Sequence, residues 1–337
     1  MASVQIADIY NPVVFAGLTQ EAQIELNRFI ASGVAVPNAT IQSAVSPGGN
    51  TGELTNFNPL DTVEPNYSDD VPANLSVAQK IATTKQRFRS AQRNKSYSVM
   101  DLADQLALQP ALATGAITGR FGFFWARDDE QRTIASCLGV LADNIANDAG
   151  DMVVTVGNDA VGAVVDAERI SANVVIDAQQ TMGDHSNDLT MILMPSIIYA
   201  RLKKQNLITF IPNARGEVNF PTYLGLNIIV DDSAPVTVGA NRNLYTCILF
   251  GSGVFGTAMG RNPMPSELFR DPASGNGGGQ TLLWSRVNNI CHPLGFDFTG
   301  ATITGQSASY ADLAATNNWN RIWNRKNIPL AFLQVND

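Results

Sequence analysis

The sequence is poor in charge, and this shortage favours some functions over others. Charged residues make up 15% of the 337-residue chain, whereas about 25% is usual in soluble domains. A surface with so few charges is modestly soluble unless further copies of the chain cover it, so the composition favours self-assembly. The net charge of −8 and the pI near 4.8 argue against tight, sequence-independent binding of nucleic acid by the whole surface.

Histidine and cysteine are also scarce. The two histidines, His185 and His292, lie far apart, and no cysteine spacing complements them, so we expect no metal site. The three cysteines, Cys137, Cys247 and Cys291, are scattered, and an odd count favours free thiols in a reducing compartment over a disulfide framework.

Long apolar runs are missing as well. No run reaches the roughly 18 residues that a membrane span requires, so we expect no membrane partner. The first residues, MASVQIADIYNPVVFAG, lack the basic segment of a secretory signal, so we expect none.

No catalytic constellation stands out. A Gly-x-Ser-x-Gly elbow is absent, and Ser186 is beside His185 only in sequence. Two groups of acids stand close together in sequence: Asp231 with Asp232, and the acids at 128–130. We interpret their carboxylates as solvated or salt-bridged, which is the usual state of such groups. We therefore predict no catalytic residue and no cofactor. A soluble α/β enzyme that uses Asp231 and Asp232 as acids remains an alternative. Binding of nucleotides or divalent metals would favour this enzyme over a structural protein.

The run Gly275-Asn276-Gly277-Gly278-Gly279 raises the question of a phosphate-binding loop. Such loops lead into a helix and commonly carry a lysine. Here the following residues, QTLLWSRVNNI, alternate as a strand does. The glycines therefore predict a turn between two long strands, because glycine readily adopts positive φ.

The first hundred residues divide into two segments. Residues 1–49 hold one short helical stretch at 18–32 and too few large apolar groups to fold alone, which predicts an arm. Residues 50–98 predict an extended hairpin, because an acidic limb is followed by the run 85–95, in which five of eleven residues are basic and none is acidic. Its limbs would pair with each other or with those of a neighbour. The charged residues in question are Asp61, Glu64, Asp69, Asp70, Lys85, Arg87, Arg89, Arg93 and Lys95.

The rest of the chain alternates helices and strands. Apolar residues at spacings of three and four predict a helix over Ala111–Asn147, with Ile134, Leu138, Leu141 and Ile145 on one stripe. Glycines within this helix predict close packing against a sheet. Strands are predicted at 152–156, 189–194, around 220–230, on both sides of Gly251, and at the end of the chain, and helices at 171–184, 195–208 and 310–323.

Several strings within this order resemble the major capsid proteins of tailed bacteriophages. They run from the long helix to the C-terminus: ARDDEQRTIASCLGVLADN, MILMPSIIYARLKKQNLITFIP, FPTYLGLNIIVDD, YTCILFGSGVFG, RDPASGNGGGQTLLWSRVNNICHPLGF and NWNRIWNRKNIPLAFL. Together they cover about two thirds of the chain. The N-terminal hundred residues match in layout only.

The resemblance implies an α+β protein with the tailed-phage capsid fold. That fold has an N-terminal arm (1–49), an extended hairpin loop (50–98), a peripheral domain with a long spine helix and long strands (99–182 and 263–310), and an axial α/β domain (183–262 and 311–337). It implies that the charged loop residues above, and Gly277 at the strand tip, contact neighbouring subunits.

The function implied is self-assembly into hexamers and pentamers of an icosahedral head that encloses double-stranded DNA. The implied partners are other copies of the chain, a portal protein, separate scaffolding or decoration proteins, and packaged DNA contacted weakly and non-specifically. The protein would be made in the bacterial cytoplasm and reside in the virion. Some members of the family crosslink a loop lysine to an asparagine of a neighbouring subunit. The loop lysines here are Lys80, Lys85 and Lys95, but no acidic catalyst for that reaction can be assigned, so we expect no crosslink between subunits. A tail-tube or decoration protein is the alternative within phage particles.

Overall fold

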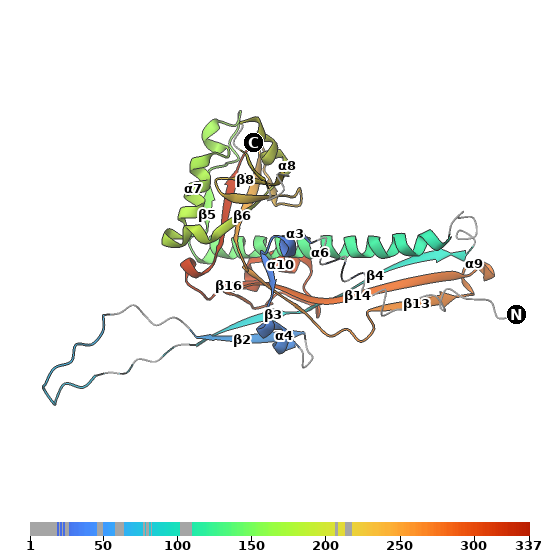
Figure 1. Ribbon diagram of the computed structural model, residues 1–337, viewed down its shortest axis with the longest axis horizontal. Helices are drawn as coiled ribbons and strands as arrows, with labels where there is room; N and C mark the ends of the chain where they lie inside the picture. Colours follow the sequence, from blue (N-terminus) through green and yellow to red (C-terminus); the bar gives the residue numbers. More distant parts are fainter. Residues whose placement is uncertain are drawn as a thin grey trace.

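The computed structural model describes residues 27–45, 50–57, 64–76, 83–101, 110–205, 208–212 and 218–337, with Thr19, Glu21, Gln23, Ala78 and Ile81. For residues 56–57, 110–119, 209–212 and 218–220 it describes the backbone alone. The molecule is elongated (Figure 1). A long helix lies over long strands, a unit carrying the C-terminus stands on that helix, and a narrow loop projects from one end.

An eight-stranded sheet forms the unit that carries the C-terminus. Its strand order is β5-β17-β11-β6-β9-β8-β7, and β10 pairs with β11. The bounds are β5 Val153–Thr155, β6 Leu189–Met194, β7 Thr209–Pro212, β8 Val218–Tyr223, β9 Leu226–Val230, β10 Val236–Val238, β11 Asn243–Gly251 and β17 Leu330–Val335. Every residue of β17 is buried, as its continuous apolar run requires of a strand covered on both faces.

Two helices pack against this sheet. They are α7 (Ala172–Gln180) and α8 (Ser196–Lys204). Val175 of α7 and Ile198 of α8 belong to the same buried cluster as Ile192 of β6. Ser171 caps α7 through its side chain, which accepts from the Val174 amide, and Pro195 precedes α8. The predicted strand–helix order of this unit is therefore confirmed.

A five-stranded sheet built on β14 forms the long part of the molecule. β14 (Gln280–Pro293) pairs with β4 (Ala91–Met100) on one side and with β13 (Ser266–Asp271) and β12 (Phe255–Met259) on the other, and β1 (Ala35–Pro37) extends the sheet beyond β12. Two smaller sheets join β2 (Thr51–Phe57) to β3 (Thr83–Arg89) and β15 (Phe296–Phe298) to β16 (Trp319–Arg321). Among the described residues, the other α-helices besides the long helix are α3 (Arg28–Ala31), α4 (Ala39–Val45), α9 (Ser274–Gly277) and α10 (Tyr310–Ala314), and short 3-10 turns occur at 166–168, 183–188, 316–318 and 325–327.

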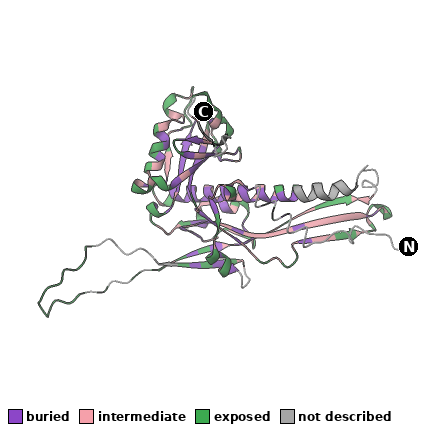
Figure 2. Cartoon of the chain, viewed as in Figure 1, coloured by how far each residue is buried: buried purple, intermediate pink, exposed green. Residues whose placement is uncertain are grey.

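The long helix, α6, runs from Pro110 to Asn147, as the sequence predicted to within a residue. Its predicted apolar stripe is partly wrong, because Ile145 is 51% exposed. Between 133 and 141 the helix is instead buried on nearly every side. The reason is that both sheets and α10 surround this stretch, whereas a single stripe suits a helix with one covered face. Figure 2 shows buried residues gathered where the C-terminal unit meets α6.

Gly139 lies in this crowded stretch of α6. A Cβ at this position would collide with the Leu313 carbonyl and the Trp319 indole. Close packing of a helix glycine is therefore confirmed here, although the partners lie on α10 and β16, not in a large sheet. The predicted helix over 310–323 is correspondingly too long, because α10 ends at Ala314 and the chain turns to place Trp319 against α6.

The glycine run makes a turn between strands, as predicted. β13 and β14 pair antiparallel from Ser266↔Ser285 to Asp271↔Gln280. The connection is a short helical turn, α9, in which Gly275, Gly277 and Gly279 have φ of 65°, 87° and 84°. Residues with side chains rarely adopt this backbone conformation, which explains why glycine stands at these three positions.

The extended hairpin is present too. β2 and β3 pair antiparallel from Thr51↔Arg89 to Phe57↔Thr83. Beyond them, residues 64–76 are exposed without exception and lie away from the body of the molecule (Figure 1). Within the predicted arm, residues 27–45 are described, and they pack on the body of their own subunit: β1 pairs with β12, Phe29 belongs to the largest core cluster and Ile41 to another. For the rest of residues 1–49 the arm stays a prediction.

The sheets cross the predicted domain limits at several points. β4, most of which we assigned to the extended loop, pairs with β14 of the long sheet, and β16, grouped with the axial unit, pairs with β15. β5 pairs with β17 and α7 joins the second core, so residues 153–180 belong structurally with the eight-stranded sheet, although we grouped them with the long helix. β12, grouped with the axial unit, pairs with β14 of the long sheet. Sequence order could not reveal these partners, since they lie apart in the chain. The peripheral and axial roles stay predictions. Within the described residues, no helix is both long and apolar enough to cross a membrane.

Candidate functional site

A cluster of buried charges joins α3, α6 and the end of β9 in the eight-stranded sheet. We call Arg28, Arg127, Glu130 and Asp231 the joint. The Arg28 guanidinium donates to Glu130 Oε2 at 2.7 Å and to Asp231 Oδ2 at 2.5 Å. Arg28 also donates to the Val230 carbonyl at 2.7 Å. Arg127 donates to both Asp231 oxygens, at 2.7 and 2.9 Å.

The two carboxylates of the joint are buried, but they stay ionised. Burial opposes ionisation of Glu130, yet the hydrogen bonds and charges of Arg28 and Arg127 outweigh it, so its pKa lies below the ordinary value. The pKa of Asp231 is lowered in the same way, with burial opposed mainly by Arg127. Two cations against two anions leave the joint electrically balanced, which is the condition for burying charge.

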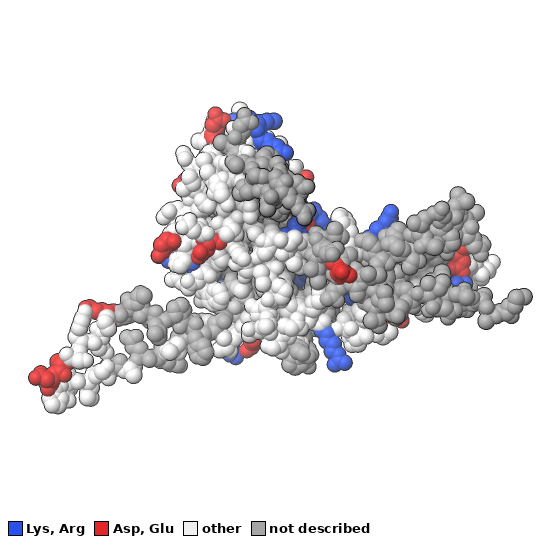
Figure 3. All heavy atoms as spheres, in the orientation of Figure 1, with Lys and Arg blue, Asp and Glu red and all other residues white. Residues whose placement is uncertain are grey.

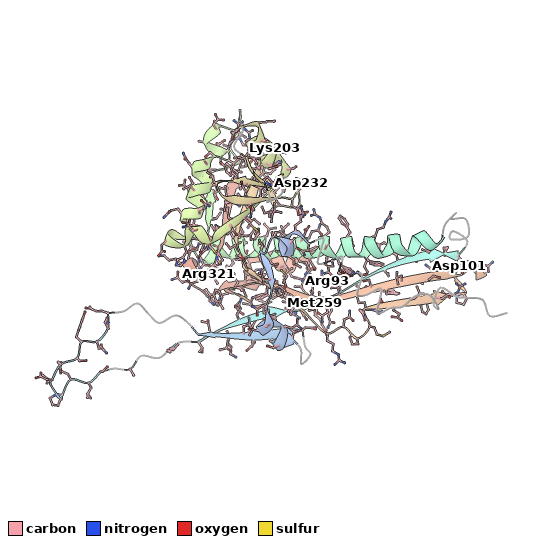
Figure 4. All side chains as sticks on the ribbon, viewed as in Figure 1. Arg93, Asp101, Lys203, Asp232, Met259 and Arg321 are labelled. Atoms are coloured by element: carbon pink, nitrogen blue, oxygen red, sulfur yellow. The ribbon has the colours of Figure 1, made fainter. Side chains whose placement is uncertain are left out.

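A second cluster on the other side of α6 holds the long sheet. Arg93 of β4 pairs with Asp128 and donates to Asp129 Oδ1 at 2.9 Å, and its guanidinium lies 5.4 Å from the centre of the Trp125 ring. Asn289 of β14 donates to the same Asp129 oxygen at 2.8 Å. Figure 4 labels Arg93 below α6. Asp128 and Asp129 thus bind the long sheet, whereas Glu130 binds Arg28 of α3, because successive helix residues point about 100° apart.

The base of the extended hairpin is anchored by a third set of contacts. Arg87 of β3 donates to Asp297 of β15, at 3.0 Å through Nε and 2.5 Å through Nη2. Arg89 donates to the carbonyls of Gln306 and Gly305 at 2.7 and 3.0 Å. The basic limb is therefore occupied largely within its own chain.

His292 lies at the centre of this anchor. Its ring stacks on Trp319 at 5.9 Å between centroids and lies 6.1 Å from the Phe88 ring, and Nε2 is 2.9 Å from the Phe296 carbonyl. Burial lowers the pKa of His292 to about 4. His292 is thus a neutral residue packed in the core. No group of three potential metal-ligating side chains occurs in the part of the chain that the structure describes.

The predicted contact residues fall into different environments. Lys85 pairs with Glu53 of β2 at 2.9 Å, and the Lys95 ammonium lies 5.2 Å from the Phe124 ring centre. Glu64, Asp69 and Asp70 are exposed beyond the hairpin strands, where Figure 3 shows acidic side chains gathered at the end of the loop. Among the described residues, no ion pair joins these three to the run 85–95. Asp61 and Lys80 lie outside the described residues.

Gly277 sits at the tip of the β13–β14 turn, with open space around it. At the same end of the molecule Asp101, labelled in Figure 4, pairs with Arg270 at 2.5 Å. The Gly277 amide donates to the Ala273 carbonyl at 3.4 Å. Neither this bond nor the open space tests whether Gly277 contacts a neighbouring subunit, so that role stays a prediction.

Sequence reasoning missed the joint altogether. Asp231 and Asp128–Glu130 were interpreted as solvated or salt-bridged, and salt bridging is confirmed. Their partners could not be identified, because Arg28 is 102 residues from Glu130 and 203 from Asp231 in the chain. The available signal was the adjacency of Arg127 and Glu130 on one helical turn.

The fold is that of a phage capsid subunit. Over 90% of this chain and 86% of the other, the structure matches the capsid of Ralstonia phage GP4, with 8% identity and a TM-score of 0.53. It also matches the capsid asymmetric unit of cyanophage Pam1 over 86% and 85% of the two chains, with 12% identity and a TM-score of 0.51. No family model matches the chain.

Sequence identity gives the family as well as the fold. The chain is 30% identical over 333 residues to the major capsid protein of Bacillus phage SPP1, covering 97% of each chain. It therefore belongs to the family of tailed-phage major capsid proteins. The protein is a structural, non-enzymatic component of the virion capsid, and that capsid is a shell of repeated copies of the subunit.

Proposed function

We propose that copies of this chain form hexameric and pentameric rings that close into an icosahedral head around double-stranded DNA. The observation that carries the proposal is the loop segment 64–76, which is exposed throughout and lies away from its own subunit (Figure 1). Tyr67 and Leu75 in this segment are 79% and 84% exposed. Large apolar side chains in such a setting are typical of a surface that a partner covers.

In this proposal the extended loop lies across a neighbouring subunit. The unit with the eight-stranded sheet packs around the ring centre as the axial domain, and α6 with the long strands forms the periphery. The tip at Gly277 and the exposed charged loop residues make further contacts between subunits. The low charge content supports large protein–protein interfaces.

We infer weak contact with packaged DNA, because a net charge of −8 gives no general attraction for phosphate. A portal protein and separate scaffolding or decoration proteins complete the proposed set of partners. Synthesis in the cytoplasm of the bacterial host precedes assembly.

Electron microscopy of the expressed chain, alone and with a scaffolding protein from the same phage, tests the proposal. Closed shells with rings of six and five are the expected product. Tubes would indicate a tail component. A subunit that stays monomeric under all these conditions would contradict the proposal.

A variant of the loop tests the observation on which the proposal rests. Replacement of Tyr67, Val71 and Leu75 by serine leaves the subunit folded, because these side chains are exposed, and abolishes shell formation. Circular dichroism checks the fold, and sedimentation checks assembly. Normal shells from the triple variant would show that the loop is not an assembly contact.

A further inference from the structure

The chain contains a single Asn-Gly pair, Asn276-Gly277, and the structure places it at an exposed tip. The pair belongs to α9, the short turn that joins β13 to β14 at the end of the long strands (Figure 1). Both residues are exposed. In such a pair the following backbone nitrogen easily reaches the asparagine side chain, because glycine has no Cβ to hinder the approach. The position of the pair therefore raises the question of a chemical modification.

The Asn276 side chain is not held in place. Within the part of the chain that the structure describes, its amide group makes no hydrogen bond. Asn289 of β14 shows the contrast, because its amide donates to Asp129 at 2.8 Å. Asn276 also has a φ of 56°, in the left-handed region that asparagine adopts more easily than most other residues with side chains. The Asn276 amide is thus open to solvent and able to rotate toward its own backbone.

The backbone nitrogen of Gly277 is weakly bonded. Its N–H donates to the Ala273 carbonyl at 3.4 Å, which is longer than the roughly 2.7–3.2 Å typical of such bonds. A Cβ built at Gly277 would meet no atom within 4 Å, so neighbouring groups do not block movement of this peptide unit. Gly277 has a φ of 87°, and glycine changes readily between this and other backbone conformations. The nitrogen can therefore move toward the Asn276 side chain without disturbing the core.

We propose that Asn276 is a site of spontaneous deamidation. The backbone nitrogen of Gly277 gives up its proton and attacks the side-chain carbonyl carbon of Asn276. A C–N bond forms, the bond to the side-chain nitrogen breaks, and that nitrogen leaves as ammonia, having gained the proton. The product is a five-membered imide. Water then opens the imide at one of its two carbonyls and gives either aspartate at position 276 or an isoaspartyl linkage. Water is the only co-reactant.

The reaction changes the tip in two ways. It adds one negative charge where Asp271 and the pair of Asp101 with Arg270 already lie. The isoaspartyl product also lengthens the backbone by an atom, inside a turn whose ends are fixed by the pairing of Asp271 with Gln280. This inference goes beyond the proposed assembly function, because it concerns the free subunit and does not depend on whether the tip contacts a neighbour.

Mass spectrometry of the unassembled chain tests the proposal. After incubation in neutral buffer, trypsin releases the peptide from Asp271 to Arg286, in which Asn276 is the only asparagine. Deamidation raises the mass of this peptide by about one unit, and chromatography separates the aspartyl from the isoaspartyl form. The internal control is Asn320. It is exposed and likewise makes no side-chain hydrogen bond among the described residues, but it lies in β16 and precedes Arg321.

We expect the modified fraction at Asn276 to grow about tenfold faster than at Asn320, or more, a ratio of rates that a small difference in activation free energy produces. The rate at Asn276 should also increase from mildly acidic to mildly alkaline buffer, because the attacking nitrogen must lose a proton. Equal rates at the two asparagines, or modification of Asn276 only after urea has unfolded the chain, would overturn the proposal. A rate that does not change with pH would contradict attack by the backbone nitrogen.

Two variants identify the reacting atoms. Asn276→Gln should abolish the mass change, because the longer side chain would have to close a less favourable six-membered ring. Gly277→Ala should slow the reaction by about tenfold, since the added Cβ hinders the nitrogen and restricts the turn. Circular dichroism checks that each variant folds, as expected for substitutions at exposed positions. A mass change that persists in Asn276→Gln would place the reaction at another amide and overturn the assignment.

Discussion

Arg28 of the short helix α3 donates to Glu130 of α6 at 2.7 Å, and so ties the N-terminal part of the chain to its longest helix. The same guanidinium reaches Asp231 at the end of β9. One side chain therefore links α3, α6 and the end of β9, three elements that are far apart in the sequence.

Removal of Arg28 should destabilise the subunit far more than removal of an exposed cation. Arg28→Met leaves Glu130 and Asp231 with one arginine between them, and the free energy of unfolding should fall by about 2–4 kcal/mol. This is somewhat less than the roughly 3–5 kcal/mol lost when a fully buried pair is broken, because Arg28 itself is partly exposed. Urea unfolding of the unassembled subunit measures the change.

The matched control is Lys85→Met. Lys85 pairs with Glu53, but both side chains are more than half exposed. Its loss should change the free energy of unfolding by less than about 1 kcal/mol. Equal effects of the two substitutions would mean that the joint stabilises the subunit no more than an exposed ion pair does.

His292 should make the subunit sensitive to mild acid. Its pKa is lowered to about 4 in the folded state, whereas an unfolded histidine titrates near pH 6.5. The folded state therefore binds fewer protons between these values. The contribution of His292 to the free energy of unfolding is fully present above about pH 6.5 and decreases as the pH falls towards 4. Below about pH 4, the subunit has lost about 3 kcal/mol of stability from this group.

The carboxylates of the joint add to the acid sensitivity at lower pH. The pKa values of Glu130 and Asp231 are lowered by their arginines, so their stabilisation is present above their unfolded values and is lost as the pH falls through the folded ones. His292→Gln should remove the pH dependence of stability between pH 6.5 and 4. The loss of stability at lower pH, which comes from the carboxylates, should remain. Urea unfolding at a series of pH values measures both, and an unchanged upper limb in the variant would contradict the assignment.

Gly139→Ala should destabilise α6, although alanine favours helices over glycine by about 1 kcal/mol. The added methyl group collides with the Leu313 carbonyl and the Trp319 indole, and Trp319 Nε1 already donates to that carbonyl at 2.6 Å. A net loss of about 1–3 kcal/mol is expected from overpacking. Thermal unfolding measures it.

The exposed position Ala146 near the end of α6 provides the control for helix propensity. Ala146→Gly should cost no more than about 1 kcal/mol, from backbone entropy alone. If Gly139→Ala proved stabilising, the close approach of α10 and β16 to α6 would be wrong.

Ile134→Pro should prevent folding. Ile134 is 4% exposed in the middle of α6, and proline there removes a backbone hydrogen bond and clashes with the preceding turn. Ile134→Ala leaves the backbone intact and should cost about 2–4 kcal/mol by creating a cavity. Circular dichroism and solubility separate the two outcomes. A soluble, native-like proline variant would contradict a continuous helix through this position.

Local sequence determined much of the architecture. The apolar runs of β6 and β17 indicate buried strands, because a strand covered on both faces has no polar alternation. The glycines at 275, 277 and 279 indicate a turn, because their positive φ values suit few other residues. The length of α6 follows from apolar spacing between Pro110 and Asn147. Each of these signals lies within one stretch of chain.

Tertiary structure alone decided which distant residues meet. The joining of Arg28 to Glu130 and Asp231, and the pairing of β5 with β17, depend on how elements pack across long stretches of sequence. The same packing leaves Phe123 exposed and buries its neighbours Phe121 and Trp125, although all three are aromatic. Residue type and local spacing determine where a helix or strand forms, but the covering of each face and the partner of each charge depend on surfaces brought together only when the chain folds.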